Sequence, residues 1–456
     1  MGITLITLGI VMLISQIYGI SVIEHIIKWW PVVLIIIGIE ILVYIFLSKQ
    51  EEPKVKFDIF SIIIISMLMI ASIGAYTLTS FITFSDGDIS FSPVFSKYNY
   101  NSTFRKSLSL DANSSNLIVN NSNGDVEVVK GEGKKIEVEA NITINNNDEA
   151  YAADVADMLI DVVNEKSTHI SSKAQKNFDR SKIGSIVINY LIKVPDTVNV
   201  EVDNKFGDVV LKGIALSGIV HNGNGGVTAE NIGGTLIVDN EFGDVSARDV
   251  KGKAEIYSKN GKVIAHSIAN SLKVESVFGN IELNDIKGFA EISNTNGEIR
   301  GVRLGGDLTV ISKFGDVIFS EISGNVDIDQ ENGYVDVSGI NKAVKVSNKF
   351  GDIKIKNAIK SITLNASNGS ITLETDKIIE QNVIIENKFG DILLKLPDTQ
   401  NGQFDAHTNL GSIENEFGFN VNKDVTKETM NGTLVNDKVR FKLSNDNGDI
   451  SVEKIK

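Results

Sequence analysis

A row of carboxylates is the feature of this sequence that most resembles a chemical site. A turn made of phenylalanine, glycine and an acidic residue recurs through the second half of the chain. The row comprises Asp208, Asp244, Asp316, Asp352 and Asp391, with Asn280 in place of one member. If the chain coils once every 36 residues, these carboxylates stack about 4.8 Å apart and could hold Ca²⁺. Calcium-binding nonapeptide repeats need a Gly-Gly-x-Gly-x-Asp turn every nine residues, which this chain lacks. We therefore favour side chains that cap the amides of their own turns.

No other set of residues in the sequence has the spacing of a catalytic or metal site. A glycan-cleaving enzyme needs paired carboxylates or a basic group in a cleft, and the repeats single out no such pair. Of the histidines His25, His169, His221, His266 and His407, the third and fourth fall outside the apolar columns and are expected to face solvent. The chain has no cysteine, phosphate loop, zinc spacing or nucleophile elbow. The sequence therefore predicts no enzyme and no catalytic, cofactor-binding or metal-binding residue.

The carboxylates belong to a repeat that must position them. A glycine recurs every 18 residues at Gly207, Gly225, Gly243, Gly261, Gly279, Gly297, Gly315, Gly333, Gly351 and Gly369. Three apolar columns keep the same step, beginning at Val209, Ile214 and Val220, with polar residues alternating between them. Such a step indicates a β-solenoid of half-buried strands, with a turn glycine at positive φ. No proline lies between Pro195 and Pro397, as expected where strands pair on both sides.

The residue before each glycine suggests a longer period. It alternates between phenylalanine and asparagine, from Phe206 and Asn224 to Phe350 and Asn368. Because like residues stack on like in many solenoids, we predict a 36-residue coil made of two 18-residue halves, rather than an 18-residue coil that stacks Phe on Asn.

Residues 1–84 predict a membrane module of three helices, at about 3–23, 30–47 and 60–81. Each apolar run approaches the roughly 20 residues needed to cross a bilayer. The first run lacks a positive start and a small-residue cleavage site, so we expect it to be retained. The loop with Lys49, Lys54 and Lys56 should be cytoplasmic, which places the C-terminal domain outside the cell. Glu40, within the second run, is interpreted as a protonated group bonded inside the bundle, or else as a partner contact.

Two stretches of this module resemble a known membrane region. Residues 2–10 read GITLITLGI, and residues 30–39 read WPVVLIIIGI. They are similar to the membrane region shared by the LiaI and LiaF proteins of Gram-positive bacteria, in which a helical hairpin ends in a Trp-Pro-led apolar run. The third run is not part of that pattern.

Residues 85–205 are predicted to be a linker and the N-terminal part of the β-domain. Apolar residues at helical spacing, including Ala152, Val155 and Leu159, predict one helix near 148–164 that caps the open end of the solenoid. Residues 206–456 hold the repeats and, where the glycine step lengthens, a distal cap. The early Asn-Gly-Asp-Val unit at 123–126, the strand ending Lys193-Val194-Pro195 and the later Gly-Asp-Val turns resemble the bacterial putative-adhesin family. That resemblance implies a β-helical surface domain and transfers no catalytic residue.

Together these features predict a non-enzymatic, multi-pass protein of the cell membrane with an extracytoplasmic β-solenoid. The expected role is an envelope scaffold or envelope-stress regulator that contacts membrane proteins or the cell wall. A surface adhesin for an external glycan or protein is the alternative, and a wall-glycan-active β-helix enzyme is the least favoured one. The net charge of −14 argues against nucleic-acid partners. No small-molecule substrate or cofactor is expected.

Overall fold

The computed structural model describes residues 82–85, 88–91, 98–112, 115–172, 178–179 and 181–455. The chain forms two compact units, Met1–Lys97 and Tyr98–Lys456. In the first unit, β1 (Ile82–Ser85) and β2 (Asp88–Phe91) form an antiparallel hairpin. The predicted spans at 3–23, 30–47 and 60–81, together with Glu40, lie outside the described residues. Within the described ranges, no helix has the length and apolar character needed to cross a membrane.

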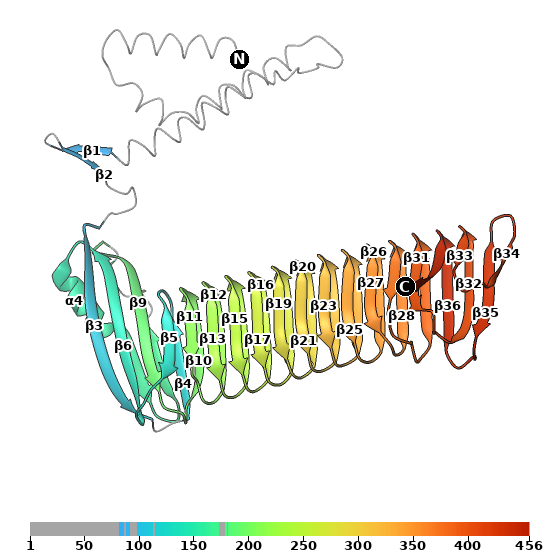
Figure 1. Cartoon of the computed structure of the whole chain (residues 1–456). Coiled ribbons are helices and arrows are strands. Elements are labelled where there is room, and N and C mark those ends of the chain that lie inside the picture. Colours follow the sequence, from blue (N-terminus) through green and yellow to red (C-terminus); the bar gives the residue numbers. More distant parts are fainter. Residues whose placement is uncertain are drawn as a thin grey trace, which may run out of the picture. The chain divides into compact units, whose positions relative to one another are not determined.

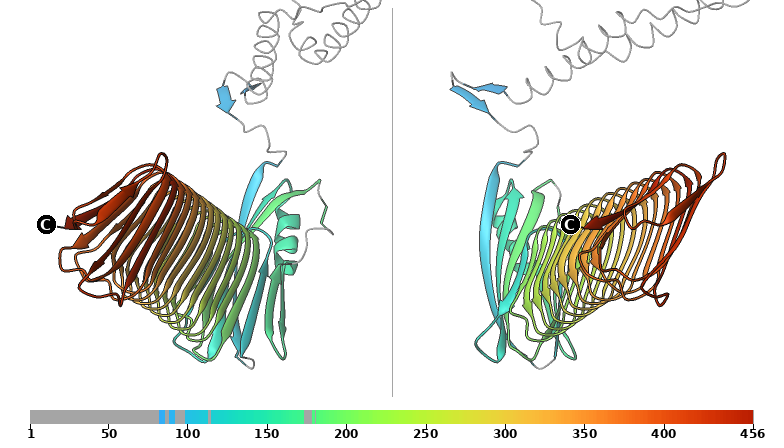
Figure 2. Two further views of the ribbon diagram at one scale, coloured as in Figure 1. Left: turned by 90° about the vertical axis from the view of Figure 1, so that its right-hand side faces the viewer. Right: turned by 45° about the vertical axis from the view of Figure 1, so that its right-hand side comes forward.

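The second unit is a β-solenoid of about 11 turns (Figure 1). One turn, or rung, consists of two short strands and two tight turns, as in β12 (Gly218–Asn224) followed by β13 (Val227–Ile232). Each strand pairs in parallel with the equivalent strand one rung away, for example β12 with β14 (Leu236–Phe242). The rungs therefore build two sheets that face each other and run the length of the domain, as the end-on view in Figure 2 shows.

In the described part of the chain, the first sheet has 18 strands and the second has 17. Besides β12 and β14, the first contains β4 (Asn116–Asn121), β7 (Ile160–Asn164), β8 (Thr168–Ser172), β10 (Asn199–Phe206), β16 (Ala254–Asn260), β18 (Leu272–Phe278), β20 (Ala290–Asn296), β22 (Leu308–Phe314), β24 (Val326–Asn332), β26 (Val344–Phe350), β28 (Ile362–Asn368), β30 (Val383–Phe389), β32 (Gly402–Leu410), β34 (Asn420–Lys423), β35 (Glu428–Leu434) and β36 (Arg440–Asn447). Besides β13, the second contains β3 (Tyr100–Asp111), β5 (Val126–Lys130), β6 (Lys135–Asn146), β9 (Ile183–Val194), β11 (Val209–Lys212), β15 (Val245–Val250), β17 (Val263–Ile268), β19 (Ile281–Ile286), β21 (Ile299–Leu304), β23 (Val317–Ile322), β25 (Val335–Ile340), β27 (Ile353–Ala358), β29 (Ile371–Glu374), β31 (Ile392–Pro397), β33 (Ile413–Asn415) and β37 (Ile450–Ile455).

The core lies between the two sheets and is made of the predicted apolar columns. Val220, Val238 and their equivalents point inward from the first sheet, and Val227 and Ile232 with theirs point inward from the second; all are buried. Alternate residues on each strand face solvent and are mostly polar. Because every rung repeats the same inward pattern, each rung buries its branched side chains against the rungs above and below. The predicted β-solenoid is confirmed.

The predicted 36-residue coil is wrong, because the coil is 18 residues long. Phe206 pairs with Asn224, and Asn224 pairs with Phe242, so phenylalanine and asparagine stack alternately. The reason is local: two strands of six or seven residues and two tight turns already close one rung. The alternating residue sits on the exposed rim, where no buried neighbour requires like to stack on like.

The N-terminal end of the solenoid is closed by a change of strand direction. In the second sheet, β9 pairs in parallel with β5 but antiparallel with β6, and β3 continues antiparallel. The helix α4 (Glu149–Met158) packs on β3, β6 and β7 and buries Ala152 and Val155. Its N-cap is Asp148, whose side chain accepts from the Tyr151 amide. The predicted helix is confirmed but ends earlier than 164, because residues from Ile160 form strand β7.

At the distal end, the strands are no longer stacked in chain order. The last strands, β36 and β37, insert between β30/β31 and β32/β33. The antiparallel strands β35 and β34 then close the first sheet. Phe404 stacks on Phe441 with ring centroids 4.3 Å apart, and Phe417 and Phe419 pack beside them.

Candidate functional surface

The most regular surface feature is a row of exposed phenylalanines, which we call the phenylalanine rim. It follows the edge where the first sheet meets the glycine turn. Its members are Phe206, Phe242, Phe278, Phe314, Phe350 and Phe389, exposed by 44–57%, with Leu410, 55% exposed, in the last place. They occupy alternate rungs, so successive rings lie about 9.5 Å apart, twice the usual strand spacing. An asparagine separates each pair, as Asn224 separates Phe206 from Phe242.

The rim contains a hollow between its first two phenylalanines. The hollow has a volume of about 490 Å³ and is lined by Phe206, Phe242 and Gly223, with His221 and Asp239 on the outer face of the first sheet. Asn224, which lies between the two phenylalanines in the stack, lines it as well. Aromatic side chains left exposed in a row are unusual for a solvated surface and mark a candidate contact site.

The glycine turn fixes the shape of the rim. The repeat glycines have φ between 119° and 148°, a region that other residues rarely adopt. A Cβ on Gly225 would lie 2.1 Å from the Gly207 carbonyl oxygen, and the same clash recurs at each following rung. The predicted positive φ of these glycines is confirmed, and the close approach of successive backbones adds a second reason for glycine.

The carboxylates that follow the glycines accept hydrogen bonds from backbone amides. The Asp208 Oδ1 accepts from the Gly226 amide at 2.7 Å, and the Asp352 Oδ1 accepts from the Ser370 amide at 2.8 Å. Each carboxylate thus caps the turn of the next rung, which corrects the prediction that it caps its own turn. Since Asp208 and Asp244 are two rungs apart, their spacing is about 9.5 Å and not 4.8 Å. Within the described ranges, no cluster of three or more His, Cys, Asp or Glu is placed to hold a metal.

A buried polar ladder lies beneath the rim, and sequence reasoning missed it. The Asn348 amide nitrogen donates to the carbonyl oxygens of Gly333 and Gly351, at 2.8 and 2.9 Å. Asn204 likewise donates to Gly207 and to the Asn222 side chain. The ladder satisfies turn carbonyls that would otherwise be buried without a partner. Its signal was a polar residue two places before most of the rim phenylalanines and asparagines. Asparagine is replaced there by Ser258, Ser276, Ser312, Gln330 and Ala366.

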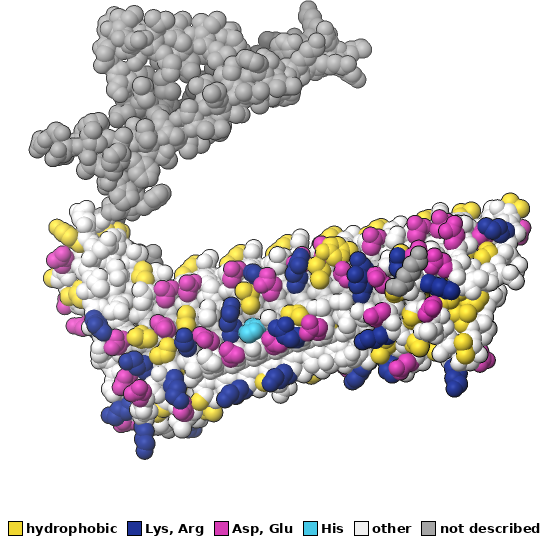
Figure 3. Space-filling view, viewed as in Figure 1, with side chains coloured by type: hydrophobic (Ala, Val, Ile, Leu, Met, Phe, Trp, Pro, Cys, Tyr) yellow, Lys and Arg dark blue, Asp and Glu magenta, His cyan; other side chains and the backbone are white. Residues whose placement is uncertain are grey.

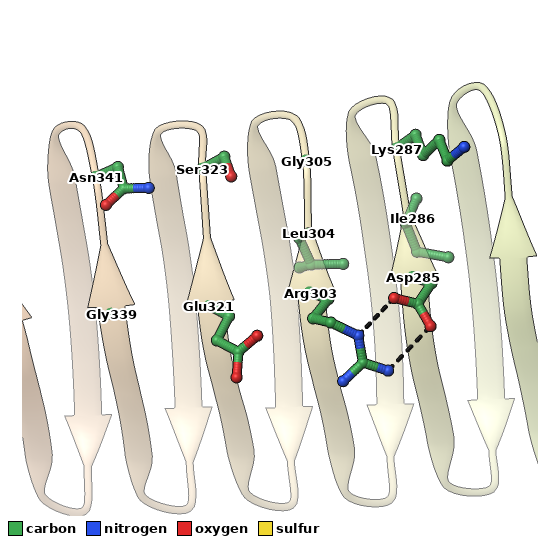
Figure 4. Close-up of a pocket in the computed structure, with 10 residues that line it drawn as sticks. All are labelled: Asp285, Ile286, Lys287, Arg303, Leu304, Gly305, Glu321, Ser323, Gly339 and Asn341. Atoms are coloured by element: carbon green, nitrogen blue, oxygen red, sulfur yellow. Dashed lines mark hydrogen bonds and ion pairs between the residues drawn. The ribbon is translucent and has the colours of Figure 1, made fainter.

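A second hollow runs along the opposite edge of the rungs. There one residue per rung takes a left-handed conformation, as Asp285, Arg303 and Glu321 do with φ of 56–59°. The hollow has a volume of about 440 Å³. Figure 4 shows its lining residues at the ends of neighbouring strands and in the loops that follow them. A further hollow of about 690 Å³ shares Asp285 and Lys287 with it, so the two form one shallow groove.

Three charged residues of this part of the solenoid, Asp285, Arg303 and His266, lie close together. The guanidinium of Arg303 donates to both Asp285 carboxylate oxygens, at 2.5 and 2.9 Å, as the dashed lines in Figure 4 show. Hydrogen bonding to Arg303 holds the pKa of Asp285 below its usual value, and the same contact raises the pKa of Arg303. His266 approaches Asp285 at 3.5 Å. The arrangement is a surface ion-pair network.

The remaining sequence candidates are spread along the domain. His221 is half-exposed and lies 3.9 Å from Asp239, while the ring of His407 hydrogen-bonds Ser444 at 2.8 Å. His169 lies in β8, and His25 falls outside the described residues. Figure 3 shows acidic and basic side chains intermixed over the visible side of the domain. The four described histidines lie in four different strands, β8, β12, β17 and β32.

Comparisons with known proteins agree with this picture. Residues 302–453 match the family model Toastrack DUF4097, and residues 1–85 match the LiaF transmembrane domain. No curated protein matches the chain.

Three solved structures are similar to parts of it. A putative cell adhesion protein from Clostridium sporogenes is 12% identical, covering 78% of this chain and all (100%) of that one, with a TM-score of 0.17. A putative lipid binding protein from Parabacteroides distasonis is 11% identical over 78% of this chain and 97% of that one, with a TM-score of 0.17. A putative adhesin from the same species is 11% identical over 64% and 96%, with a TM-score of 0.19. Scores this low carry no argument about function. Both family resemblances predicted from the sequence are confirmed by the two family models, one matching residues 1–85 to the LiaF transmembrane domain and the other matching residues 302–453 to the toastrack domain.

Proposed function

We propose that this protein is a non-enzymatic scaffold or stress regulator of the cell envelope, anchored in the membrane and acting through protein or wall contacts. One observation carries the proposal: a β-solenoid follows closely on a segment matched by a membrane domain, residues 1–85. The two family matches support a membrane-associated surface or envelope protein. The more specific role, as a scaffold or stress regulator, is proposed from the surface features of the solenoid.

The solenoid presents an extended surface that suits binding to other molecules. Its turn carboxylates, such as Asp208, cap neighbouring rungs, and groove charges such as Asp285 and Arg303 pair with each other. These groups stabilise an extended surface whose exposed rows repeat from rung to rung. A long repetitive surface of this kind suits lateral binding to proteins or polymers.

The proposed topology follows from charge in the N-terminal segment. Three helices at about 3–23, 30–47 and 60–81, with the loop of Lys49, Lys54 and Lys56 in the cytoplasm, place the solenoid outside a Gram-positive-type cell. In that position the solenoid meets wall material and the outer parts of other membrane proteins.

Crosslinked membranes test the proposal. The full chain is captured after crosslinking in cells, and a deletion strain is challenged with a wall-damaging agent. We expect co-purification of envelope proteins or wall fragments and an altered stress response. No envelope partner, together with an unchanged response, contradicts the proposal. Binding of the full chain to an external glycan or host surface would favour an adhesin instead.

A further inference from the structure

The phenylalanine rim is flanked by charges of opposite sign on its two sides. Four of its turns read Lys-Phe-Gly-Asp, at residues 205–208, 313–316, 349–352 and 388–391. The lysine precedes the ring in the first-sheet strand. The aspartate follows the ring, after the glycine, in the turn into the second sheet. The turn at Phe242 instead has Glu241 in the lysine position. The rim is therefore an apolar stripe between a flank that is mainly lysine and a flank that is mainly aspartate.

Most of these flanking charges have no ionic partner within the described part of the chain. Lys205, Lys313 and Lys388 form no ion pair there, whereas Lys349 pairs with Glu331 at 2.6 Å. The turn aspartates form no ion pair there either; Asp352, for instance, uses one oxygen to cap an amide. Elsewhere on the solenoid, by contrast, lysines pair with carboxylates on neighbouring rungs, as Lys345 does with Asp327. Unpaired charges beside exposed rings indicate a surface shaped for a partner.

A second copy of the chain complements this surface in one orientation. If two rims face each other with both chains running in the same direction, a twofold axis parallel to the solenoid relates them. That rotation sets the lysine flank of each copy against the aspartate flank of the other. In the opposite direction, the twofold axis lies across the solenoid and sets lysine against lysine and aspartate against aspartate. Charge complementarity therefore selects the parallel arrangement.

The register is set by the alternation of rim residues. In a parallel pair related by a twofold axis, phenylalanine lies opposite phenylalanine and asparagine opposite asparagine at every rung. Paired asparagines such as Asn332 and its copy can hydrogen-bond, while a shift of one rung would set each against a ring. The rim is also large enough. Six rings, each about half-exposed, offer on the order of 100 Å² apiece, and with the flanks this approaches the roughly 800 Å² per partner of a stable interface.

We propose that the phenylalanine rim is a homodimer interface in which two copies associate in parallel and in register. The inference does not rest on the proposed function, because it uses only the rim and its flanking charges.

Single cysteines test this geometry, because the chain has none of its own. Asn224→Cys, Asn296→Cys and Asn368→Cys are made one at a time in the full chain, in membranes, and oxidised. The parallel, in-register dimer predicts that all three variants form disulfide-linked dimers to a similar extent. An antiparallel dimer predicts a crosslink at no more than the position nearest its axis. Crosslinking at one position, at none, or only to another protein overturns the proposal.

A rim substitution with a matched control completes the test. Phe314→Asn with Phe350→Asn, placed in the Asn296→Cys chain, should reduce the crosslinked fraction at least tenfold. Phe289→Asn removes a phenylalanine of similar exposure, 55%, at the opposite edge and should leave the crosslink unchanged. Unchanged far-ultraviolet circular dichroism shows that the variants are folded. An equal crosslinked fraction in the rim variant and the control contradicts the proposal.

Discussion

At the scale of single residues, the turn glycine controls the solenoid. Gly297 has φ of 132°, and a Cβ there would lie 2.2 Å from the Gly279 carbonyl oxygen. Neither backbone can move away without breaking the pairing of its rung. We therefore predict that Gly297→Ala lowers the free energy of unfolding by about 3 kcal/mol or more. Gly133→Ala is the control, because the nearest atom to its added Cβ would be 3.8 Å away. Urea unfolding of the two variants checks the difference, and equal stabilities contradict the proposed clash.

The hydroxyl of Tyr190 lies in an unfavourable, buried environment. Its side chain is 3% exposed in β9, and within the described residues its hydroxyl has no hydrogen-bond partner. Burial raises the pKa of Tyr190 well above the usual value of 10.0. Below about pH 10, Tyr190 is protonated in both the folded and the unfolded chain, so its ionisation does not change the free energy of unfolding. As the pH rises further, Tyr190 ionises in the unfolded chain before it does so in the folded one, and the free energy of unfolding falls.

Tyr190→Phe is therefore predicted to raise the free energy of unfolding by about 1 kcal/mol near neutral pH. The substitution should also lessen the loss of stability between about pH 10 and pH 11. Thermal unfolding of both proteins across this range measures the effect. A variant less stable than the parent at neutral pH would show that the hydroxyl has a partner.

At the scale of elements, the 18-residue rung is the unit of folding. Removing residues 280–297 joins Gly279 to Glu298 and deletes one complete rung, including β19 and β20. Val263 can then pair with Ile299, and Leu272 with Leu308, so both apolar columns stay in register. We predict a folded β-domain with slightly lower stability, since one rung interface is lost.

Circular dichroism and limited proteolysis of the full chain carrying this deletion check the prediction. Deleting residues 280–288 removes half a rung and should disrupt the fold. If the 18-residue deletion is as damaging as the 9-residue one, the 18-residue rung is not the repeating unit.

Elements were predictable from the sequence where the core determines them. The inward columns at Val209, Ile214 and Val220 keep their spacing because each must stay buried, so the β-solenoid could be predicted. The prediction of the coil length was wrong because Phe206 and Asn224 lie on an exposed rim, where residues that stack on each other need not be alike. The insertion of β37 between β31 and β33 could not be predicted, because that pairing is out of chain order and leaves no periodic signal.

The candidate surface was only partly predictable. The aspartate row was visible in the sequence, but its role depends on which rung its side chains reach, and Asp208 reaches the next one. The buried asparagine ladder was hidden because Ser258 and Gln330 interrupt it. The charged flanks of the rim follow from the Lys-Phe-Gly-Asp turns, but their significance appears only when the coil length is known.

At the scale of the whole molecule, we propose that a membrane segment precedes an extracytoplasmic β-solenoid. Residues 1–85 match the LiaF transmembrane domain, and the solenoid carries the candidate contact surfaces. In that arrangement the rim and the groove face the cell envelope from outside the bilayer. The contacts proposed with wall material and with other membrane proteins therefore depend on which side of the membrane the solenoid occupies.

Labelling of a single cysteine in intact cells tests this placement most directly. Val425, in the loop between β34 and β35, is 96% exposed, so Val425→Cys adds a reactive thiol to a cysteine-free chain without touching the core. Labelling with a maleimide that does not cross membranes is compared before and after cell lysis. An extracytoplasmic solenoid predicts equal labelling in both cases, whereas labelling only after lysis would place the solenoid inside the cell and contradict the proposed topology.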